Sequence, residues 1–382
     1  MKIIVAFLCI VLTVFAHEKV FVVERENSAL AVIENHKLKN EIKNLHNFNH
    51  AVVKFIENDG YVITRDGYLI KFDPIHEKKI AEVQASKSAI GFTLAKDFIA
   101  VANYANKTVE IYDRNLRHLQ TIDTGSRNVG IKTYKDYLVF AAMDSDAIWV
   151  MKKIVEKIPL RCIKPDGTPM YEKKIHFEKV KIIRNAGEMP FDAMINKNLY
   201  VVGFFNSPFV GVLNLDTFEY KQVPLKLEKR TMVLKVPHFG FWSIMKDKFF
   251  IPAVGDNKVF VFDQNFHFLK AIEVEGNPVF TSLSPDRRYL AVTFSGKKFP
   301  IVQIVDTKSL QVIKRFDFGG MVLHVRWSKE EPLLYVSNNG LSKVIGMDIK
   351  NWKEAFEVAV PKPSGIFIFD MKQGNRPKEA LQ

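Results

Sequence analysis

The sequence is almost without cysteine, since its 382 residues include only Cys9 and Cys162. Two cysteines cannot form the disulfide framework of a small secreted protein, and they cannot supply a metal site that needs several thiolate ligands. The sequence has no CxxCH motif, which excludes a covalently attached c-type haem, and no GxGxxG motif for a nucleotide cofactor. Any chemistry of this chain must therefore rest on other side chains.

Long hydrophobic runs are also lacking, with one exception at the amino terminus. Residues 3–15 are apolar apart from Thr13, one lysine precedes them, and the small residue Ala16 follows. This order is typical of a secretory signal peptide, and the run is shorter than the ~20 residues that span a membrane. We expect residues 1–16 to be a signal peptide and residues 17–382 to be an exported, soluble protein without a transmembrane span. An uncleaved anchor and a buried first strand are the alternatives.

The charge is unbalanced toward basic residues, with a formal net charge of +13 at pH 7. Such an excess suits an acidic partner, which can be a nucleic acid, a membrane surface or a ligand with several carboxylates. The basic residues are nevertheless scattered in runs no longer than two, which argues against nucleic acid. A surface that is simply rich in lysine would give the same excess, so charge alone does not decide the function.

Helical periodicity is almost absent as well, and short strands that end in an acidic or polar residue recur instead. These strand ends fall near residues 34, 73, 113, 151, 216, 263, 306 and 348, mostly in steps of about 40 residues. Each follows another strand across a short turn, as in GYVITRDGYLIKFD at 60–73, where Asp-Gly provides the turn chemistry of a β-hairpin. Four short strands in ~40–45 residues are typical of one blade of a β-propeller.

The eight strand ends predict an all-β fold, a single eight-bladed β-propeller that occupies residues 17–382. One step is about 65 residues long, which predicts an insertion at about 152–187 that forms an extra hairpin or loop on one face. Propellers close their ring by combining the first and last strands in one blade, which removes exposed edges. We expect KVFVVERE, directly after the signal, to pair in this way with C-terminal strand material that includes GIFIFD at 365–370.

Polar residues recur where the chain enters the innermost strand of a blade, and these entry points lie at one mouth of the ring. His50, at the end of NLHNFNH, precedes AVVKF, and the same blade position elsewhere carries Arg127, Asp192, His238 and His324. A single histidine at a strand start is more often a turn residue than a ligand. Three histidines that occupy the same position in three blades indicate a site that binds either a metal ion or the iron of a macrocycle.

The size of the mouth favours the macrocycle. A zinc or copper ion needs compact ligands at ~2.0–2.3 Å, which the wide mouth of an eight-bladed ring hardly allows. A large planar cofactor would fill the mouth, where Arg65 and Arg127 could pair with its carboxylates. Aromatic side chains are available to pack on its two faces, namely Phe191, Phe239, Phe241, Trp242 and Phe280.

Stretches from successive blades carry a resemblance to known proteins. They include VITRDGYLIKFDP at 62–74, VANYANKTVEIYD at 101–113, AAMDSDAIWV at 141–150, VLKVPHFGFW at 233–242 and MVLHVRW at 321–327. In this order they resemble the NirF family of haem d1 biosynthesis proteins and, more distantly, the haem d1 propeller of cytochrome cd1 nitrite reductase. The likeness covers nearly the whole mature chain. It implies that the protein binds haem d1 or dihydro-haem d1 in the periplasm.

The resemblance also implies roles for individual residues. His50 looks like the proximal iron ligand, which would make it the metal-binding residue, and His238 lies near the position of a distal-pocket histidine. His324 resembles a histidine that the family keeps, and Arg65 resembles an arginine that faces the carboxylates of the cofactor. Asp144, in MDSDAIWV, stands where the family has an acid that we expect to matter for activity.

The activity implied is that of an oxidoreductase, a dihydro-haem d1 dehydrogenase that acts late in haem d1 biosynthesis for denitrification. It would oxidise a propionate side chain of the macrocycle to an acrylate. Asp144 and His238 are the candidate catalytic residues, as proton acceptors, and the electrons would leave to the iron, a partner or a small oxidant. Nitrite reduction is not implied, because the chain has no c-haem domain and GNPVF at 276–280 lacks a second distal histidine.

The same resemblance allows a second hypothesis, a non-catalytic carrier that holds haem d1 and delivers it to nitrite reductase. The implied partners are a haem d1 precursor, nitrite reductase and other haem d1 maturation proteins, without nucleic acid. A third hypothesis, a propeller that only binds proteins, is opposed by the histidines at the mouth. The sequence alone does not separate the enzyme from the carrier.

Overall fold

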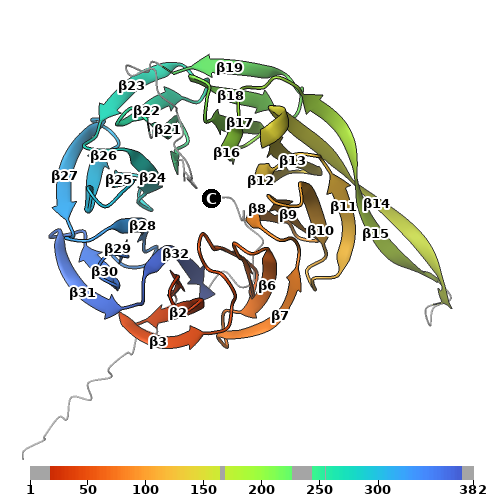
Figure 1. Ribbon diagram of the computed structural model, residues 1–382, viewed down its shortest axis with the longest axis horizontal. Coiled ribbons are helices and arrows are strands. Elements are labelled where there is room, and N and C mark those ends of the chain that lie inside the picture. The colour runs from red at the N-terminus through yellow and green to blue at the C-terminus, as the bar shows by residue number, and fades with distance from the viewer. Residues whose placement is uncertain (1–17, 164–167, 226–242, 254, 372–382) are drawn as a thin grey trace, which may run out of the picture.

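The computed structural model describes residues 18–163, 168–225, 243–253 and 255–371. These residues form eight four-stranded sheets, which stand as blades around a central axis and close into a ring (Figure 1). The prediction of an all-β, eight-bladed β-propeller is therefore confirmed. In the described ranges the only helical element is a 3-10 turn, η1 (Met143–Ser145), and no helix there is long and apolar enough to cross a membrane.

Seven blades are built from four strands in chain order, with the innermost strand first. Blades 2, 3 and 4 consist in turn of β4 (Val52–Ile56), β5 (Asp59–Ile63), β6 (Tyr68–Asp73), β7 (Lys78–Gln84); β8 (Ala89–Leu94), β9 (Ile99–Asn103), β10 (Thr108–Tyr112), β11 (His118–Asp123); and β12 (Asn128–Tyr134), β13 (Tyr137–Ala142), β14 (Ala147–Ile163), β15 (Pro169–Ile183). Blades 5 and 6 consist of β16 (Pro190–Asn196), β17 (Leu199–Phe204), β18 (Phe209–Asn214), β19 (Tyr220–Pro224); and β20 (Ser243–Ile244), β21 (Lys248–Ala253), β22 (Lys258–Asp263), β23 (Phe268–Glu273). Blades 7 and 8 consist of β24 (Pro278–Leu283), β25 (Tyr289–Phe294), β26 (Ile301–Asp306), β27 (Gln311–Asp317); and β28 (Val322–Trp327), β29 (Leu333–Asn338), β30 (Lys343–Asp348), β31 (Lys353–Ala359).

Blade 1 joins the two ends of the described chain. It contains, from the centre outward, β32 (Pro363–Asp370), β1 (Glu18–Glu24), β2 (Ala29–Glu34) and β3 (Lys37–Ile42), and β1 pairs antiparallel with β32. Glu18 accepts hydrogen bonds from Ser328 Oγ (2.6 Å) and from the Lys329 backbone N–H (2.7 Å), both next to blade 8. Lys19 Nζ pairs with Glu77 of blade 2 at 2.6 Å. The ring is closed by the strand pairing that the sequence led us to expect.

Apolar side chains fill the spaces within and between the blades. Strands in the middle of a blade, such as β9 with the sequence IAVAN, are buried along their whole length, whereas the outer strand β7 is mostly exposed. A middle strand is buried because other blades cover both of its faces. Phe21 of blade 1 is fully buried, and its ring centroid lies 5.4 Å from those of Phe55 and Phe72 in blade 2. Adjacent blades thus share one apolar layer.

The antiparallel order of the strands determines which loops meet at each mouth of the ring. The loop that enters the innermost strand of a blade lies at the same end as the turn between its second and third strands. We call this end the entry mouth and the opposite end the far mouth. Side chains that share a site at the entry mouth must come from these entry loops and these second-to-third-strand turns.

Blade 4 carries a long extension of its two outer strands. β14 and β15 have 17 and 15 residues and project beyond the ring as a hairpin (Figure 1). We call the outer part of this hairpin, residues 154–163 and 169–176, the arm. The residues that break the repeat thus lengthen a hairpin of the blade itself. β14 and β15 are the third and fourth strands of the blade, and the arm extends them outward beyond the rim of the ring.

Candidate functional site

The loop that precedes β4 holds His50 at the entry mouth. Its apolar residues Leu45 and Phe48 are buried in the core between blades 1 and 2, and they anchor the loop. Asn44, His46 and His50 adopt left-handed backbone conformations, with φ of 60°, 65° and 70°. Asparagine and histidine are among the residues that visit this region most readily, which explains why the NLHNFNH stretch can turn so sharply. The sequence of the loop thus dictates where the His50 side chain emerges.

A cavity of about 280 Å³ lies at the entry mouth, where blades 7, 8, 1 and 2 meet. Its lining includes Arg25, His50, Phe280, Met321, His324 and Phe367. His50 and His324 come from blades 2 and 8, yet they border the same cavity. Two of the three histidines that share a phase in the sequence are therefore brought together by the ring, with Phe280 beside them.

The His50 imidazole is neutral at ordinary pH. Burial, followed by the positive charges of Arg25 and Arg65, lowers the pKa of His50 from 6.5 to about 4. A neutral imidazole keeps a lone pair on one ring nitrogen, which is the form that binds a metal. Within the described residues no cluster of three or more His, Cys, Asp or Glu side chains could hold a bare metal ion. The iron of a macrocycle needs only one such axial ligand from the protein.

His324 is suited to donate a hydrogen bond. Its side chain is buried, its Nδ1 accepts a hydrogen bond from the Ile366 backbone N–H at 3.2 Å, and its ring packs near Phe280 and Phe367. Burial, followed by the charge of Arg326, lowers the pKa of His324 well below 6.5, so the ring is neutral. With Nδ1 as the acceptor, the single proton of a neutral imidazole is on Nε2. His324 therefore presents a donor through Nε2, and it is a weak base.

Arg25 is a site residue that the sequence reasoning missed. It lies in the turn between β1 and β2 and lines the cavity together with His50. Burial lowers the pKa of Arg25, and its buried Nε has no hydrogen-bond partner among the described residues. A cation that is partly removed from water in this way costs free energy unless an anion pairs with it. The signal was available, because Arg25 occupies in blade 1 the second-to-third-strand turn that Arg65 occupies in blade 2.

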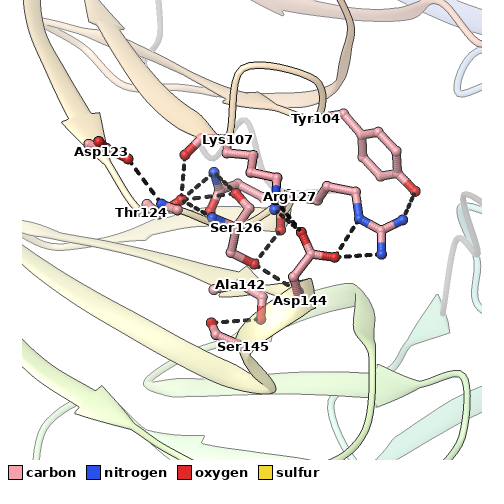
Figure 2. Close-up of polar contacts among 11 residues, drawn as sticks. Tyr104, Lys107, Asp123, Thr124, Ser126, Arg127, Ala142, Asp144 and Ser145 are labelled. Atoms are coloured by element: carbon pink, nitrogen blue, oxygen red, sulfur yellow. Dashed lines mark hydrogen bonds and ion pairs between the residues drawn. The ribbon is translucent and has the colours of Figure 1, made fainter.

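A second polar group extends from blade 2 to blade 4 along the entry mouth. Arg65 donates to Ser88 Oγ at 2.8 Å, and its guanidinium lies 5.5 Å from the ring centroid of Tyr104. Arg127 lies 5.1 Å from the same ring and donates from Nη1 to Tyr104 Oη at 2.8 Å (Figure 2). Tyr104, which the sequence reasoning also missed, therefore joins the two predicted arginines by cation–π contacts. The positive charge of Arg65 also lowers the pKa of His50, so this set of residues lies next to the cavity.

Asp144 holds Arg127 in place. Its carboxylate accepts hydrogen bonds from the Arg127 backbone N–H at 2.9 Å and from Nε at 2.7 Å, while Nη2 lies 2.5 Å away (Figure 2). Lys107 Nζ adds a more distant positive charge at 3.8 Å. Burial raises the pKa of Asp144, but the hydrogen bonds from Arg127 outweigh it and lower the pKa below the usual range. The carboxylate is thus ionised and committed to a positioning contact.

Among the remaining predicted residues, those that the structure describes do not all join these two groups. Asp192 is partly buried on β16 and is not among the residues that line the cavity. Its negative charge favours the protonated forms of Lys132 and Tyr200. His238 lies outside the described residues, as do Phe239, Phe241 and Trp242. Phe191, offered by the sequence as a ring to pack on a cofactor, is buried in the core, 4.9 Å from Phe205. Only Phe280 among the described candidate rings lines the cavity.

The low pKa of His50 has a measurable consequence. At pH 5 a group with a pKa of about 4 is about 90% neutral, whereas an ordinary histidine with a pKa near 6.5 is about 97% protonated. We expect NMR of the histidine rings to show that the His50 imidazole, like that of His324, stays neutral at pH 5 because of its burial and the adjacent arginines. Its resonance should be missing in His50→Gln, with free histidine in the same buffer as the control. A titration midpoint near 6.5 for this resonance would contradict the description of the site.

Comparison with known proteins assigns the chain to a family. Residues 16–161 and 173–372 match the family described as the cytochrome D1 heme domain, and the chain therefore belongs to that family. The NirF proteins of Stutzerimonas stutzeri and Pseudomonas aeruginosa are each 27% identical to it, over 374 and 351 residues. The alignments cover 91% and 86% of this chain, and 90% and 84% of the two relatives. The predicted resemblance to NirF-type proteins is confirmed.

Solved structures share the fold. The structure described as "dihydro-heme d1 dehydrogenase NirN in complex with DHE" matches with a TM-score of 0.74 and 18% identity, over 93% of this chain and 76% of that chain. Apo AztD from Citrobacter koseri matches with a TM-score of 0.64 and 11% identity, over 92% and 97% of the two chains. At such low identities the likeness concerns the fold alone.

Proposed function

We propose that the cavity at the entry mouth binds haem d1 or a late haem d1 precursor, with His50 as the ligand of its iron. The observation that carries this proposal is the neutral, partly buried imidazole of His50, which shares one cavity with Arg25 and His324. An imidazole is a common axial ligand of haem iron. The family to which the chain belongs is described by a haem domain, which supports a ligand of this class.

The arginines around His50 suit a ligand that carries several carboxylates. Arg25 is a partly buried cation at the cavity itself, and a carboxylate there would pair with it. Arg65 and Arg127 are held by Ser88 and Asp144, so their guanidinium groups are already oriented before a ligand arrives. His324, with its proton on Nε2, supplies a hydrogen-bond donor for a polar group of the macrocycle.

We further propose that the bound precursor is oxidised, with a propionate side chain converted to an acrylate. One hydrogen leaves each of two adjacent carbons and a carbon–carbon double bond forms, which releases two protons and two electrons. The protons pass to a base at the mouth, for which the sequence suggests His238 or Asp144, and the electrons pass to an external redox protein or small oxidant. The solved relative described as a dihydro-heme d1 dehydrogenase, which has the same fold, supports this reaction class.

The state of Asp144 favours a second candidate, the non-catalytic carrier. The carboxylate is ion-paired with Arg127 and its pKa is lowered, which makes it a poor proton acceptor. His324, neutral with a lowered pKa, is also a weak base. In the carrier the same residues would bind haem d1 without changing it, and the protein would deliver it to nitrite reductase.

In either role we place the protein in haem d1 biosynthesis for denitrification. The order of a lysine, an apolar run and a small residue in residues 1–16 supports export to the periplasm. Its partners there would be nitrite reductase and other haem d1 maturation proteins.

An anaerobic titration of the purified protein with dihydro-haem d1 tests the proposal. We expect a saturable change in visible absorption and, after addition of ferricyanide as the electron acceptor, an extracted ligand lighter by two hydrogens. The same incubation without protein controls for direct oxidation by ferricyanide. A spectral change with an unchanged ligand mass would favour the non-catalytic carrier. The absence of any spectral change would reject haem d1 as the ligand.

A further inference from the structure

The arm that projects from blade 4 carries exposed apolar side chains on the described residues that flank 164–167, and we call these flanking residues the apolar tip. Five large apolar side chains near its end are exposed by 39% or more, namely Ile158, Leu160, Ile163, Met170 and Tyr171. Ile163 is exposed by 70% and Tyr171 by 54%. Single exposed apolar residues are ordinary on a protein surface, but a group of them on one projecting hairpin marks a contact site.

The strand register places these apolar residues on both faces of the hairpin. Tyr171 pairs with Pro159, so the two share one face, and Ile158, next to Pro159, lies on the other face. Met170 alternates with Tyr171 and therefore shares the face of Ile158. A protein that docked on the arm would need only one apolar face, whereas a tip that enters lipid is surrounded by it and benefits from both.

Lysines flank the tip on the face that carries Tyr171. Lys157 and Lys173 lie directly opposite each other in the hairpin, although like charges in such a pair repel. The paired positions on this face, from Val155 to Ile163, include no acidic residue, and the glutamates of the arm lie on the other face. Two opposed lysines beside exposed apolar side chains fit a surface that combines negative charge with apolar chains.

We propose that the arm docks the protein on a membrane surface that contains anionic phospholipid. The apolar tip enters the headgroup region, and the lysines lie beside the lipid phosphates. The formal charge of +13 adds a long-range attraction to the same surface. Because the arm projects outward beyond the rim of the ring (Figure 1) and contributes no residue to the cavity lining, the cavity with His50 remains accessible in the docked protein to a ligand or a second protein.

Co-sedimentation with lipid vesicles tests this proposal. The chain is used from His17 onward, because every strand that the structure describes begins at Glu18 or later and the apolar residues 3–15 would themselves bind lipid. We expect binding to vesicles of phosphatidylglycerol and phosphatidylethanolamine, weaker binding in 0.5 M salt, and none to phosphatidylcholine alone. The double variants Ile163→Ser/Tyr171→Ser and Lys157→Glu/Lys173→Glu should each weaken binding ~10-fold or more.

Matched variants elsewhere on the ring control for general effects. Ile313→Ser/Leu341→Ser removes two comparably exposed apolar side chains, and Lys314→Glu/Lys353→Glu reverses two exposed lysines on outer strands. These variants should bind the anionic vesicles almost as the parent protein does. Equal losses of binding in the arm and control variants would show that the binding comes from non-specific charge attraction, and they would overturn the proposal. No binding to anionic vesicles would also overturn it and leave an acidic protein as the partner of the arm.

Discussion

Replacement of His50 by alanine is expected to abolish the visible absorption change on addition of dihydro-haem d1 and to weaken binding ~100-fold or more, about 2.8 kcal/mol. The reason is that His50 is the proposed iron ligand, whereas His324, which is also neutral, carries its proton on Nε2 and accepts a hydrogen bond at Nδ1. The measurement is the same anaerobic titration, read by absorption and by equilibrium binding.

Exogenous imidazole should restore the absorption change in His50→Ala, because it can occupy the space that the side chain leaves. His267→Ala is the matched control, since His267 is an exposed histidine paired with Asp263 on the outer part of blade 6. It should bind like the parent protein. If His50→Ala retained the absorption change without added imidazole, the iron ligand would be another residue and the proposed site would be wrong.

Asp144→Asn is expected to act on ligand affinity and not on turnover. The carboxylate positions Arg127 through hydrogen bonds at 2.9 and 2.7 Å, so its loss should weaken binding ~5- to 10-fold while kcat stays nearly unchanged. Arg127→Ala should have a similar effect. The double variant should be little worse than Arg127→Ala alone, because residues that act through one contact are not additive.

The opposite result would give Asp144 the catalytic role that the sequence suggested. A proton acceptor that is removed typically costs 10²–10⁴-fold in rate, so a fall in kcat of that size with unchanged affinity would contradict the positioning role. Asp136→Asn is a control at the far mouth, where Asp136 is exposed and pairs with Lys153. It should change neither affinity nor kcat. Single-turnover mass measurements separate the two effects even if the parent protein turns over slowly.

The fold could be predicted from the sequence because each blade is a local unit. Alternation, β-branched and aromatic residues and turn sequences such as Asp-Gly or Asn-Lys specify the hairpins within a few dozen residues, and the period counts the blades. The shared phase of His50 and His324 within their blades was enough to predict that both lie at the entry mouth. The arm, in contrast, could be predicted only as an insertion that forms an extra hairpin or loop, because its length and direction depend on pairing between β14 and β15.

The sequence by itself thus determined the all-β repeat, the eight blades and the level of the ring at which polar side chains gather. Only the tertiary structure decided which of them meet, because contacts around a ring depend on which blades are neighbours and not on distance along the chain. It brought Arg25 and His324, from opposite ends of the chain, into one cavity with His50. It also tied Asp144 to Arg127 and joined Arg127 to Arg65 through Tyr104. Burial and neighbouring charge then lowered the pKa of His50, and neither can be read from a single strand.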